Sequence, residues 1–361
     1  MARNHFTTLK DLKEQVQDWH ETCYDDTCSP HALEYTSNFF VDQIIGEQAQ
    51  GNVFRQTHLN DHAFNQLCGR LDIPAGWARD EGRCPDELRG EIVNWKLAHY
   101  DKRFLLRNRI TPSGEITRAV LSNRYGVYNH IDFVDAISDA ITRAGIDVRV
   151  WRPQVGDELR TYVLVEGIDF GATEHRNGNI TNGDGGGAGG MKPAIYISNS
   201  EIGTGKVRVH AGLYRSYCMN GLIYGYRTER QNSLVHRGRS NQHLGLLVNE
   251  MIADAMNMSE EAATAFLETR STLIEATSVS NIVERWNKKY GIVVDAGTQW
   301  LNLCQMQANR EGRVSLFDVI NHATDVAGGI ESNDTRENME VMAGELIHAR
   351  IAERDLAERV R

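Results

Sequence analysis

Apolar residues recur at helical spacing through the first part of the chain. Thr8 and Asp11 have the spacing of a capping box, in which each side chain bonds the other residue's backbone at the start of a helix. Apolar residues follow at intervals of three and four, as on the buried face of an amphipathic helix. Helices are predicted to begin at Leu9, after Asn60 and after Pro85. Residues 1–95 are therefore predicted to form a mainly helical N-terminal segment.

The pattern changes to short alternating segments in residues 96–245. Two of these segments, 104–109 and 116–122, flank a turn sequence that contains Pro and Gly and favours a hairpin. A helix is predicted over 131–144, because its apolar residues share one face and Gly145 supplies a left-handed end. Further strands are predicted over 148–151, 159–166, 194–198 and 206–210. This part is predicted to be an α+β core.

Residues 246–361 show helical spacing to the end of the chain. One helix is expected to start at Ser259, because Glu260 and Glu261 would then lie in its first turn, where the helix dipole favours acids. Further helices are predicted over 279–289, 299–307, 316–326 and 335–357. The chain is thus predicted to have an α+β fold, with a central, mostly antiparallel sheet, packed helices, and helical N-terminal and C-terminal segments.

The stretch 177–190 interrupts the predicted sheet. Seven of its fourteen residues are glycine and none is aromatic, so it has little apolar surface to offset the entropy of ordering. We expect a mobile loop here. A calcium-binding turn is conceivable from the sequence NGDGGG, but only one Asp is present, and no metal site is predicted.

Composition narrows the class of protein. The chain has 361 residues, 41% of them hydrophobic and 24% charged, as in a folded globular protein. No apolar run approaches the about 20 residues that a membrane-spanning helix needs, so no membrane partner is expected. The N-terminus lacks the apolar core of a secretion signal. We expect the protein in the cytoplasm of the cell that makes it.

Residue types that hold metals, cofactors or nucleophiles are scattered. The six cysteines form no CxxC pair and the thirteen histidines are dispersed, so no metal and no cofactor are predicted. The sequence Gly203–Lys206 lacks the spacing of a phosphate-binding loop, and no Gly-x-Ser-x-Gly motif is present. Cys218 with His210 or His236 offers a thiol–imidazole pair without an orienting motif. No catalytic residue is assigned, and an enzyme is the less favoured interpretation.

Charge is unevenly distributed along the chain. The net charge is −10, yet residues 201–245 contain seven Lys or Arg and two acidic residues. Residues 246–361 contain eleven basic and nineteen acidic residues, so the acidity lies in the tail. Tyrosines are interleaved with the central arginines. Because arginine binds phosphate through charged hydrogen bonds and an aromatic ring can stack on an unpaired base, this segment is predicted to bind single-stranded nucleic acid.

The predicted contacts can be assigned to individual residues. The phosphate-binding residues are Lys206, Arg208, Arg215, Arg227, Arg230, Arg237 and Arg239. The stacking residues are Tyr214, Tyr217 and Tyr224. A structural alternative stays open, in which the tyrosines lie in the core or an interface and the arginines face solvent or pair with the acidic tail.

Polar residues cluster at a predicted turn between two strands at the centre of the chain. Gly203 and Gly205 are explained as turn residues. The residues predicted to stabilise this turn through hydrogen bonds are Asn199, Ser200, Glu201 and Asn220.

Several segments resemble one known family. They are HAFNQLCGRLDIPAGWARD, RFLLRNR, RAVLSNRYGVYNHIDFVDAI, YISNSEIGTGKVRVHAGLYRSYCMNGLI and SLFDVINHATDVAGG. These segments make most of the chain similar to the phage/plasmid-like protein family, domain of unknown function 932, with the central segment as the closest match. The glycine-rich stretch departs from the family pattern as an insertion. The family brings no catalytic residues, and the resemblance implies a role in DNA replication or recombination.

The sequence and the resemblance together favour a nucleic-acid-binding accessory protein that binds or anneals single-stranded DNA. The expected partners are single-stranded nucleic acid, further copies of the chain in a homo-oligomer, and a host or phage replication protein. Known annealing proteins build oligomeric rings from a small sheet, a helix and a basic groove, and the predicted core has comparable parts. Two alternatives stay open: a protein that binds or inhibits a host factor, and a nucleic-acid-processing enzyme around Glu201, Arg215 and Asn220.

Overall fold

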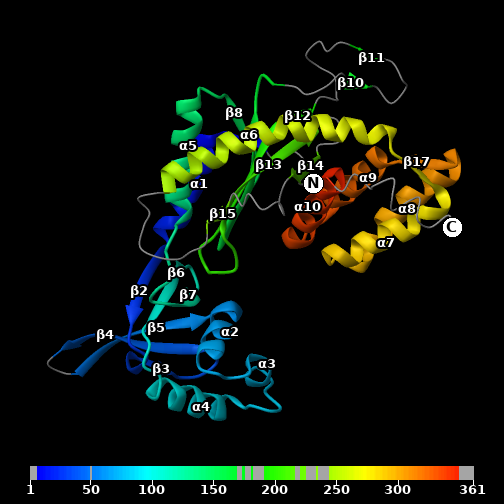
Figure 1. The fold of residues 1–361 in the computed structure, drawn as a ribbon. Helices are drawn as coiled ribbons and strands as arrows, with labels where there is room; N and C mark the ends of the chain where they lie inside the picture. The colour runs from blue at the N-terminus through cyan, green and yellow to red at the C-terminus, as the bar shows by residue number, and fades with distance from the viewer. Residues whose placement is uncertain are drawn as a thin grey trace.

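The computed structural model describes residues 6–48, 51–168, 173–174, 180–181, 191–215, 220–224, 233–234 and 244–348. These residues form two large sheets with helices packed on them, so the predicted α+β class is confirmed. In Figure 1 the first sheet and its helices lie in the lower part of the view, and the second sheet lies above them with the C-terminal helices at its side.

The first sheet has six strands from residues 23–122. In order across the sheet they are β2 (Cys23–Cys28), β6 (Phe104–Thr111), β7 (Gly114–Ser122), β5 (Gly51–Leu59), β4 (Phe40–Gln48) and β3 (Leu33–Tyr35). All neighbours are antiparallel except β5 and β7, which pair in parallel. The helices beside this sheet are α2 (Asp61–Arg70), α3 (Ala75–Ala78) and α4 (Asp86–Ala98). Phe64, Leu67 and Phe104 lie in the apolar core that they share.

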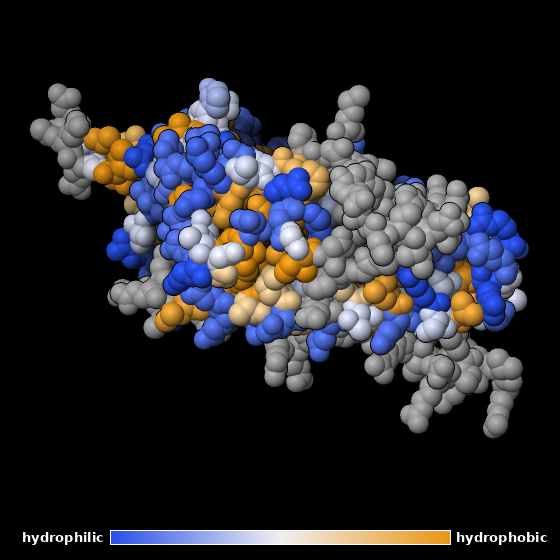
Figure 2. Space-filling view, turned by 90° about the horizontal axis from the view of Figure 1, so that it is seen from above, coloured by the Kyte–Doolittle hydropathy of each residue, from blue (hydrophilic) through white to orange (hydrophobic). Residues whose placement is uncertain are grey.

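The β4–β5 hairpin extends outward from the first sheet, at the left of Figure 1. Ile45 and Phe54, in its outer part, are 45% and 52% exposed. Figure 2 shows apolar surface at this same end of the molecule.

The second sheet is antiparallel throughout its described strands. In order they are β1 (Phe6–Thr7), β8 (Val148–Val155), β9 (Glu158–Val165), β12 (Met191–Ser200), β13 (Val207–Arg215) and β14 (Asn220–Tyr224), and β15 (Ser233–Leu234) also pairs with β13. Side chains alternate between the two faces of each strand. Ile195 and Ile197 of β12 are buried on one face, whereas Tyr196 and Ser198 point to the other, which carries the polar site described below.

The described residues form seven further helices, some packed on the second sheet and others grouped at its side. They are α1 (Leu9–Glu21), α5 (His130–Ala144), α6 (Leu244–Glu268), α7 (Val279–Tyr290), α8 (Val294–Glu311), α9 (Leu316–Gly329) and α10 (Asn333–His348). A small two-stranded sheet, β16 (Leu273–Glu275) with β17 (Arg313–Ser315), joins the C-terminal helices. The long helix α6 packs against β12, β13 and α5, and α10 packs against α9 and β14.

Local signals in the sequence predicted several helix ends correctly. Thr8 and Asp11 form the predicted capping box, and the Asn60 side chain accepts a hydrogen bond from the backbone of Ala63 at the start of α2. Gly145 ends α5 in the left-handed conformation, with φ at 63°. In each case the determinants lie within a few residues of one another, so sequence alone is sufficient.

The segment 1–95, predicted to be mainly helical, contains helices α1 to α3 and most of α4 but also five strands. Strands β1–β5 lie in this range, and β2 and β5 pair with β6 and β7. The first sheet therefore crosses the predicted boundary at residues 95 and 96. The polar sequence CYDDTC of β2 shows no strand-like alternation, because it is held by pairing with a partner about eighty residues away.

The predicted start of a helix at Ser259 is also wrong. Helix α6 runs continuously through this position, and Ser259 is fully buried. Its hydroxyl lies 2.9 Å from the carbonyl oxygen of Ala255 and 3.3 Å from that of Gly212. A short polar residue here lets the helix approach β13 closely, and the same polarity looked like a cap in the sequence.

Most of the stretch 177–190 lies outside the described residues, so its predicted mobility stays a prediction. Its residues Ile180–Thr181 form β11, which pairs with β10 (Thr173–Glu174).

Candidate nucleic-acid interface

The turn that joins β12 to β13 is stabilised by its own side chains. The Ser200 hydroxyl accepts a hydrogen bond from the backbone N–H of Thr204 at 3.1 Å and lies 2.7 Å from the Thr204 hydroxyl. Gly203 has φ at 82°, and a Cβ at this position would lie 2.9 Å from a methyl group of Leu121. Both the predicted role of Ser200 and the need for glycine at position 203 follow from this geometry.

Asn199 connects the end of β12 to the start of α5. Its amide nitrogen donates to the carbonyl oxygen of Tyr128 and to Nδ1 of His130, both at 2.9 Å. The other ring nitrogen of His130, Nε2, lies 3.0 Å from the carbonyl oxygen of Gly156, which can only accept. His130 is therefore a neutral ring with its proton on Nε2, and burial accordingly lowers its pKa below 6.5.

Glu201 lies where the two sheets meet, with only 1% of its surface exposed. Its carboxylate accepts hydrogen bonds from Arg118 of β7 at 3.2 Å and from the backbone N–H of His130 at 2.9 Å. Its carbonyl oxygen accepts one from Arg107 of β6 at 2.8 Å. The two arginines also pair with Asp157 and Asp25, respectively. The polar junction formed by Arg107, Arg118, His130 and Glu201 therefore ties the second sheet to the first.

The polar junction keeps Glu201 ionised. Burial opposes ionisation, but His130, Arg107 and Arg118 lower the pKa of the Glu201 carboxyl to about 2. Because His130 is neutral at pH 7, the lasting positive charge comes from the two guanidinium groups. A carboxylate that is buried and already fully paired is a poor general base, so this geometry does not support the enzyme alternative centred on Glu201.

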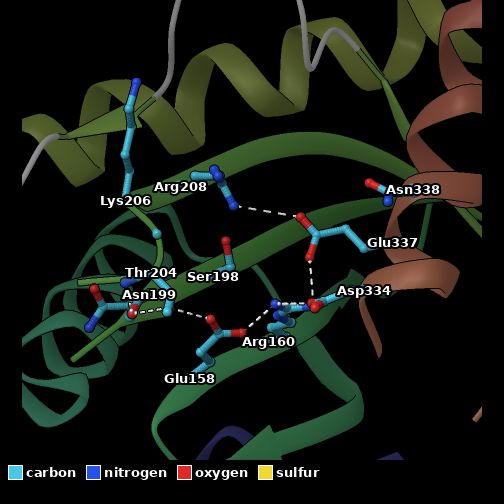
Figure 3. A pocket seen from close by; sticks show the side chains of 12 residues that line it. Glu158, Arg160, Ser198, Asn199, Thr204, Lys206, Arg208, Asp334, Glu337 and Asn338 are labelled. Carbon is cyan, nitrogen blue, oxygen red and sulfur yellow. Dashed lines mark hydrogen bonds and ion pairs between the residues drawn. The ribbon is translucent and has the colours of Figure 1, made fainter. Parts of the chain in front are cut away.

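A polar pocket of about 300 Å³ opens next to this junction, on the face of β9, β12 and β13 that α10 borders (Figure 3). Three cationic side chains line it: Arg160 of β9, and Lys206 and Arg208 at the start of β13. Three carboxylates also line it: Glu158 of β9, and Asp334 and Glu337 of α10. The pocket thus contains equal numbers of positive and negative groups, and two of the three negative groups belong to the C-terminal helix.

Ion pairs connect α10 to the sheet across this pocket. Glu337 lies 3.1 Å from Arg160 and 3.6 Å from Arg208, and Asp334 lies 2.6 Å from Arg160. Arg160 also pairs with Glu158, which accepts a hydrogen bond from Thr204. Figure 3 shows these groups as one chain of contacts from the β12–β13 turn to α10.

Ser198 and Lys206 are among the polar groups of the pocket that stand apart from this chain of contacts. Ser198 is 4% exposed, and its hydroxyl points into the pocket without a hydrogen-bond partner among the described residues. Lys206 lies at the rim, and its ammonium group extends away from the ion pairs (Figure 3). A buried hydroxyl without a hydrogen-bond partner is costly, and a water, an ion or a bound group in the pocket can satisfy it.

A third carboxylate of α10 lies deeper in the same interface. Glu340 accepts a hydrogen bond of 2.6 Å from the Tyr162 hydroxyl and lies 3.8 Å from Arg152. Burial raises the pKa of Glu340 to about 7, although Tyr162 and the nearby arginines favour its ionised form. Its protonation therefore changes within the physiological pH range.

The structure brings together two of the predicted phosphate-binding residues, Lys206 and Arg208, in this pocket. Arg215 ends β13, Asn220 and Tyr224 begin and end β14, and the backbones of Arg215 and Asn220 are paired. The side chains of these three residues are outside the described part. The remaining predicted contacts, which also lie outside the described residues, are Arg227, Arg230, Arg237, Arg239 and Tyr217.

Tyr214 does not fit its predicted stacking role. It is 4% exposed, and its ring packs edge-on against Phe6 at 5.8 Å and Trp151 at 4.8 Å between ring centres. A base cannot stack on a ring that the core already covers. For this residue the structural alternative is correct, and Arg208 likewise pairs with the acidic tail, as that alternative anticipated.

Sequence reasoning missed the partners that complete the pocket: Glu158, Arg160, Ser198, Asp334 and Glu337. One signal was available, because Asp334, Glu337 and Glu340 recur every three residues and so share one side of a helix. The face that they would meet depends on the register of β9 against β12, in which Arg160 opposes Ser198. That register is set by the whole sheet and not by local sequence.

Within the described residues, no group of three or more His, Cys, Asp and Glu side chains is placed to hold a metal ion. No described helix has both the length and the apolar character needed to cross a membrane.

The fold and the pocket define an α+β protein whose two sheets meet at a buried charged junction, beside a pocket bordered by an acidic helix. Residues 118–290 match the family model described as Domain of unknown function (DUF932). The match covers the central turn, most of the second sheet and, from the polar junction, Arg118, His130 and Glu201 but not Arg107. The resembling segments at 62–80, 103–109 and 315–329 lie outside it. Neither the curated proteins nor the solved structures yielded a match.

Proposed function

We propose that this protein binds single-stranded nucleic acid as an accessory protein of phage or plasmid DNA replication or recombination, and that it acts in the cytoplasm. The observation that carries the proposal is the meeting of Lys206, Arg208 and Arg160 in one polar pocket, at the start of the most basic part of the chain. Cationic side chains favour phosphate groups, and an acidic protein can bind nucleic acid through a local basic segment such as residues 201–245.

The arrangement of the second sheet supports an annealing role by analogy. An antiparallel sheet with the long helix α6 packed on β12 and β13 supplies the kinds of elements from which annealing proteins assemble rings. Such a role requires further copies of the chain, so we propose a homo-oligomer as well. A host or phage replication protein is the proposed partner that would bring it to its substrate.

The proposal predicts salt-dependent binding to a labelled single strand, measured by fluorescence anisotropy with DNA and RNA of the same sequence. Affinity should fall steeply with salt, because each phosphate contact releases bound counterions. Replacing Lys206 with glutamine is expected to weaken binding and to reduce the slope of log affinity against log salt by about 0.7.

Lys102→Gln is the matched control, because Lys102 is exposed just before strand β6 of the first sheet and does not line the pocket. It makes the same change in net charge and should leave the slope unchanged. Absence of measurable binding at low salt would refute the proposed function. Equal effects of the two substitutions would exclude Lys206 from the interface.

A further inference from the structure

The position of Glu337 in the pocket is the position that an anion would occupy. Its carboxylate lies between two guanidinium groups, Arg160 at 3.1 Å and Arg208 at 3.6 Å, and it is held by a helix from a distant part of the chain. Guanidinium groups bind carboxylates and phosphates with the same geometry. The unpartnered hydroxyl of Ser198 points into the same pocket and can donate to an anion there.

In this conformation, charge does not favour the entry of a phosphate into the pocket. With α10 in place, the three cations face three carboxylates, and a phosphate meets no net positive charge. Without the carboxylates of Asp334 and Glu337, the same three cations face only Glu158. A phosphodiester can therefore enter with favourable electrostatics only when these two side chains move aside.

The free energy needed to expose buried side chains decides which part of α10 can move away from the pocket. Met339, Met342, Ala343 and Leu346 are fully buried in the main core, and exposing the three large ones would cost about 1.5–3 kcal/mol each. The first turn of the helix has no such anchor, since the Asp334 side chain is 81% exposed. Movement out of the pocket therefore involves the first turn and the Glu337 side chain, while the rest of α10 stays packed against the core.

We propose that Glu337, assisted by Asp334, is a built-in competitor for nucleic-acid phosphate, and that a backbone phosphate replaces its carboxylate between Arg160 and Arg208 and accepts a hydrogen bond from Ser198. This proposal rests on the proposed function, and it adds that α10 regulates the same site. The acidic side of the helix limits binding to strands that can displace it, which suits a protein that must release its substrate.

The test compares single-strand affinity of the full chain with that of Glu337→Gln at fixed low salt. Glutamine keeps the size of the side chain but removes its charge, so two partly exposed ion pairs are lost. Affinity is expected to rise by about fivefold or more. Ser198→Ala, introduced into the Glu337→Gln protein, should lower affinity again without changing thermal stability, because Ser198 has no described partner to lose.

Glu331→Gln is the matched control, since Glu331 is exposed just before α10 and the substitution changes the net charge equally. If Glu331→Gln strengthens binding as much as Glu337→Gln, the effect is one of general charge and the competitor role is refuted. If the wild-type protein binds and Lys206→Gln weakens binding, but Glu337→Gln has no effect, the inference fails while the proposed function stands. If no variant binds a strand, the proposed function fails and the inference fails with it.

Discussion

Replacing Glu201 with alanine is expected to lower the free energy of unfolding by about 3–5 kcal/mol. The carboxylate is 1% exposed and bonds Arg118 and the backbone of His130, while Arg107 binds the same residue's carbonyl oxygen. Its removal leaves Arg118 buried with Asp157 as its remaining charged partner and breaks the connection between the two sheets. Urea unfolding, analysed by linear extrapolation, measures the change.

Two further variants identify the cause of this loss. Glu201→Gln keeps the hydrogen-bonding shape and should be destabilised less than Glu201→Ala. The double variant Arg118→Met with Glu201→Ala should lose less stability than the sum of its single changes, because the guanidinium that Glu201 would leave under-compensated is then absent as well. Glu261→Ala, on the exposed side of α6, is the control and should change stability by no more than about 0.5 kcal/mol. A loss below about 1 kcal/mol for Glu201→Ala would contradict the structural importance of the polar junction.

The contrast between Ser200 and Glu201 shows how far sequence reasoning could reach. Both were predicted to stabilise the central turn. Ser200 does so, because its partner Thr204 lies only four residues away. The partners of Glu201 come from β7 and from the start of α5, more than seventy residues earlier in the chain. The sequence could indicate that Glu201 needed partners, but it could not identify them.

The first sheet was missed for a related reason. Its hairpin of β6 and β7 was predicted, since a turn sequence and two apolar strands lie next to each other. Strand β5 pairs with β7 in parallel over only two residue pairs, and strand β2 has a polar sequence. Neither strand has a local signal strong enough to outweigh the helical patterns on either side. Contacts between distant segments stabilise them, and these contacts become visible only in the folded chain.

The same limit applies to the pocket. The basic character of residues 206 and 208 is plain in the sequence, and so is the acidity of the tail. A pairing of the central arginines with the acidic tail was predicted only as the structural alternative to nucleic-acid binding. The structure shows Arg208 paired with Glu337. Under the proposal that α10 competes with phosphate, this ion pair regulates the binding of nucleic acid.

Glu340 gives the interface of α10 a dependence on pH whose sign can be derived. Burial raises the pKa of this carboxyl from 4.5 to about 7 in the folded protein. The folded state therefore binds a proton more tightly than the unfolded chain, and the stabilisation is complete below about pH 4.5 and lost as the pH rises through 7. The groups that face Glu340 or influence its charge are Arg152, Tyr162, Tyr196, Arg336 and Glu337.

Glu340→Gln is accordingly expected to have little effect on stability at pH 5 and to stabilise the protein by up to about 3 kcal/mol at pH 8. Glutamine imitates the protonated carboxyl and can still accept the hydrogen bond from Tyr162, but it never carries the buried charge. Subtracting the two unfolding free energies at each pH removes the contribution of all other titrating groups. A difference that stays constant from pH 5 to pH 8 would show that Glu340 is ionised throughout, with Arg152 compensating its charge. A difference that grows as the pH rises would place a titrating carboxyl in the contact between α10 and the sheet, and the closure of the neighbouring pocket by α10 should then weaken over the same pH range.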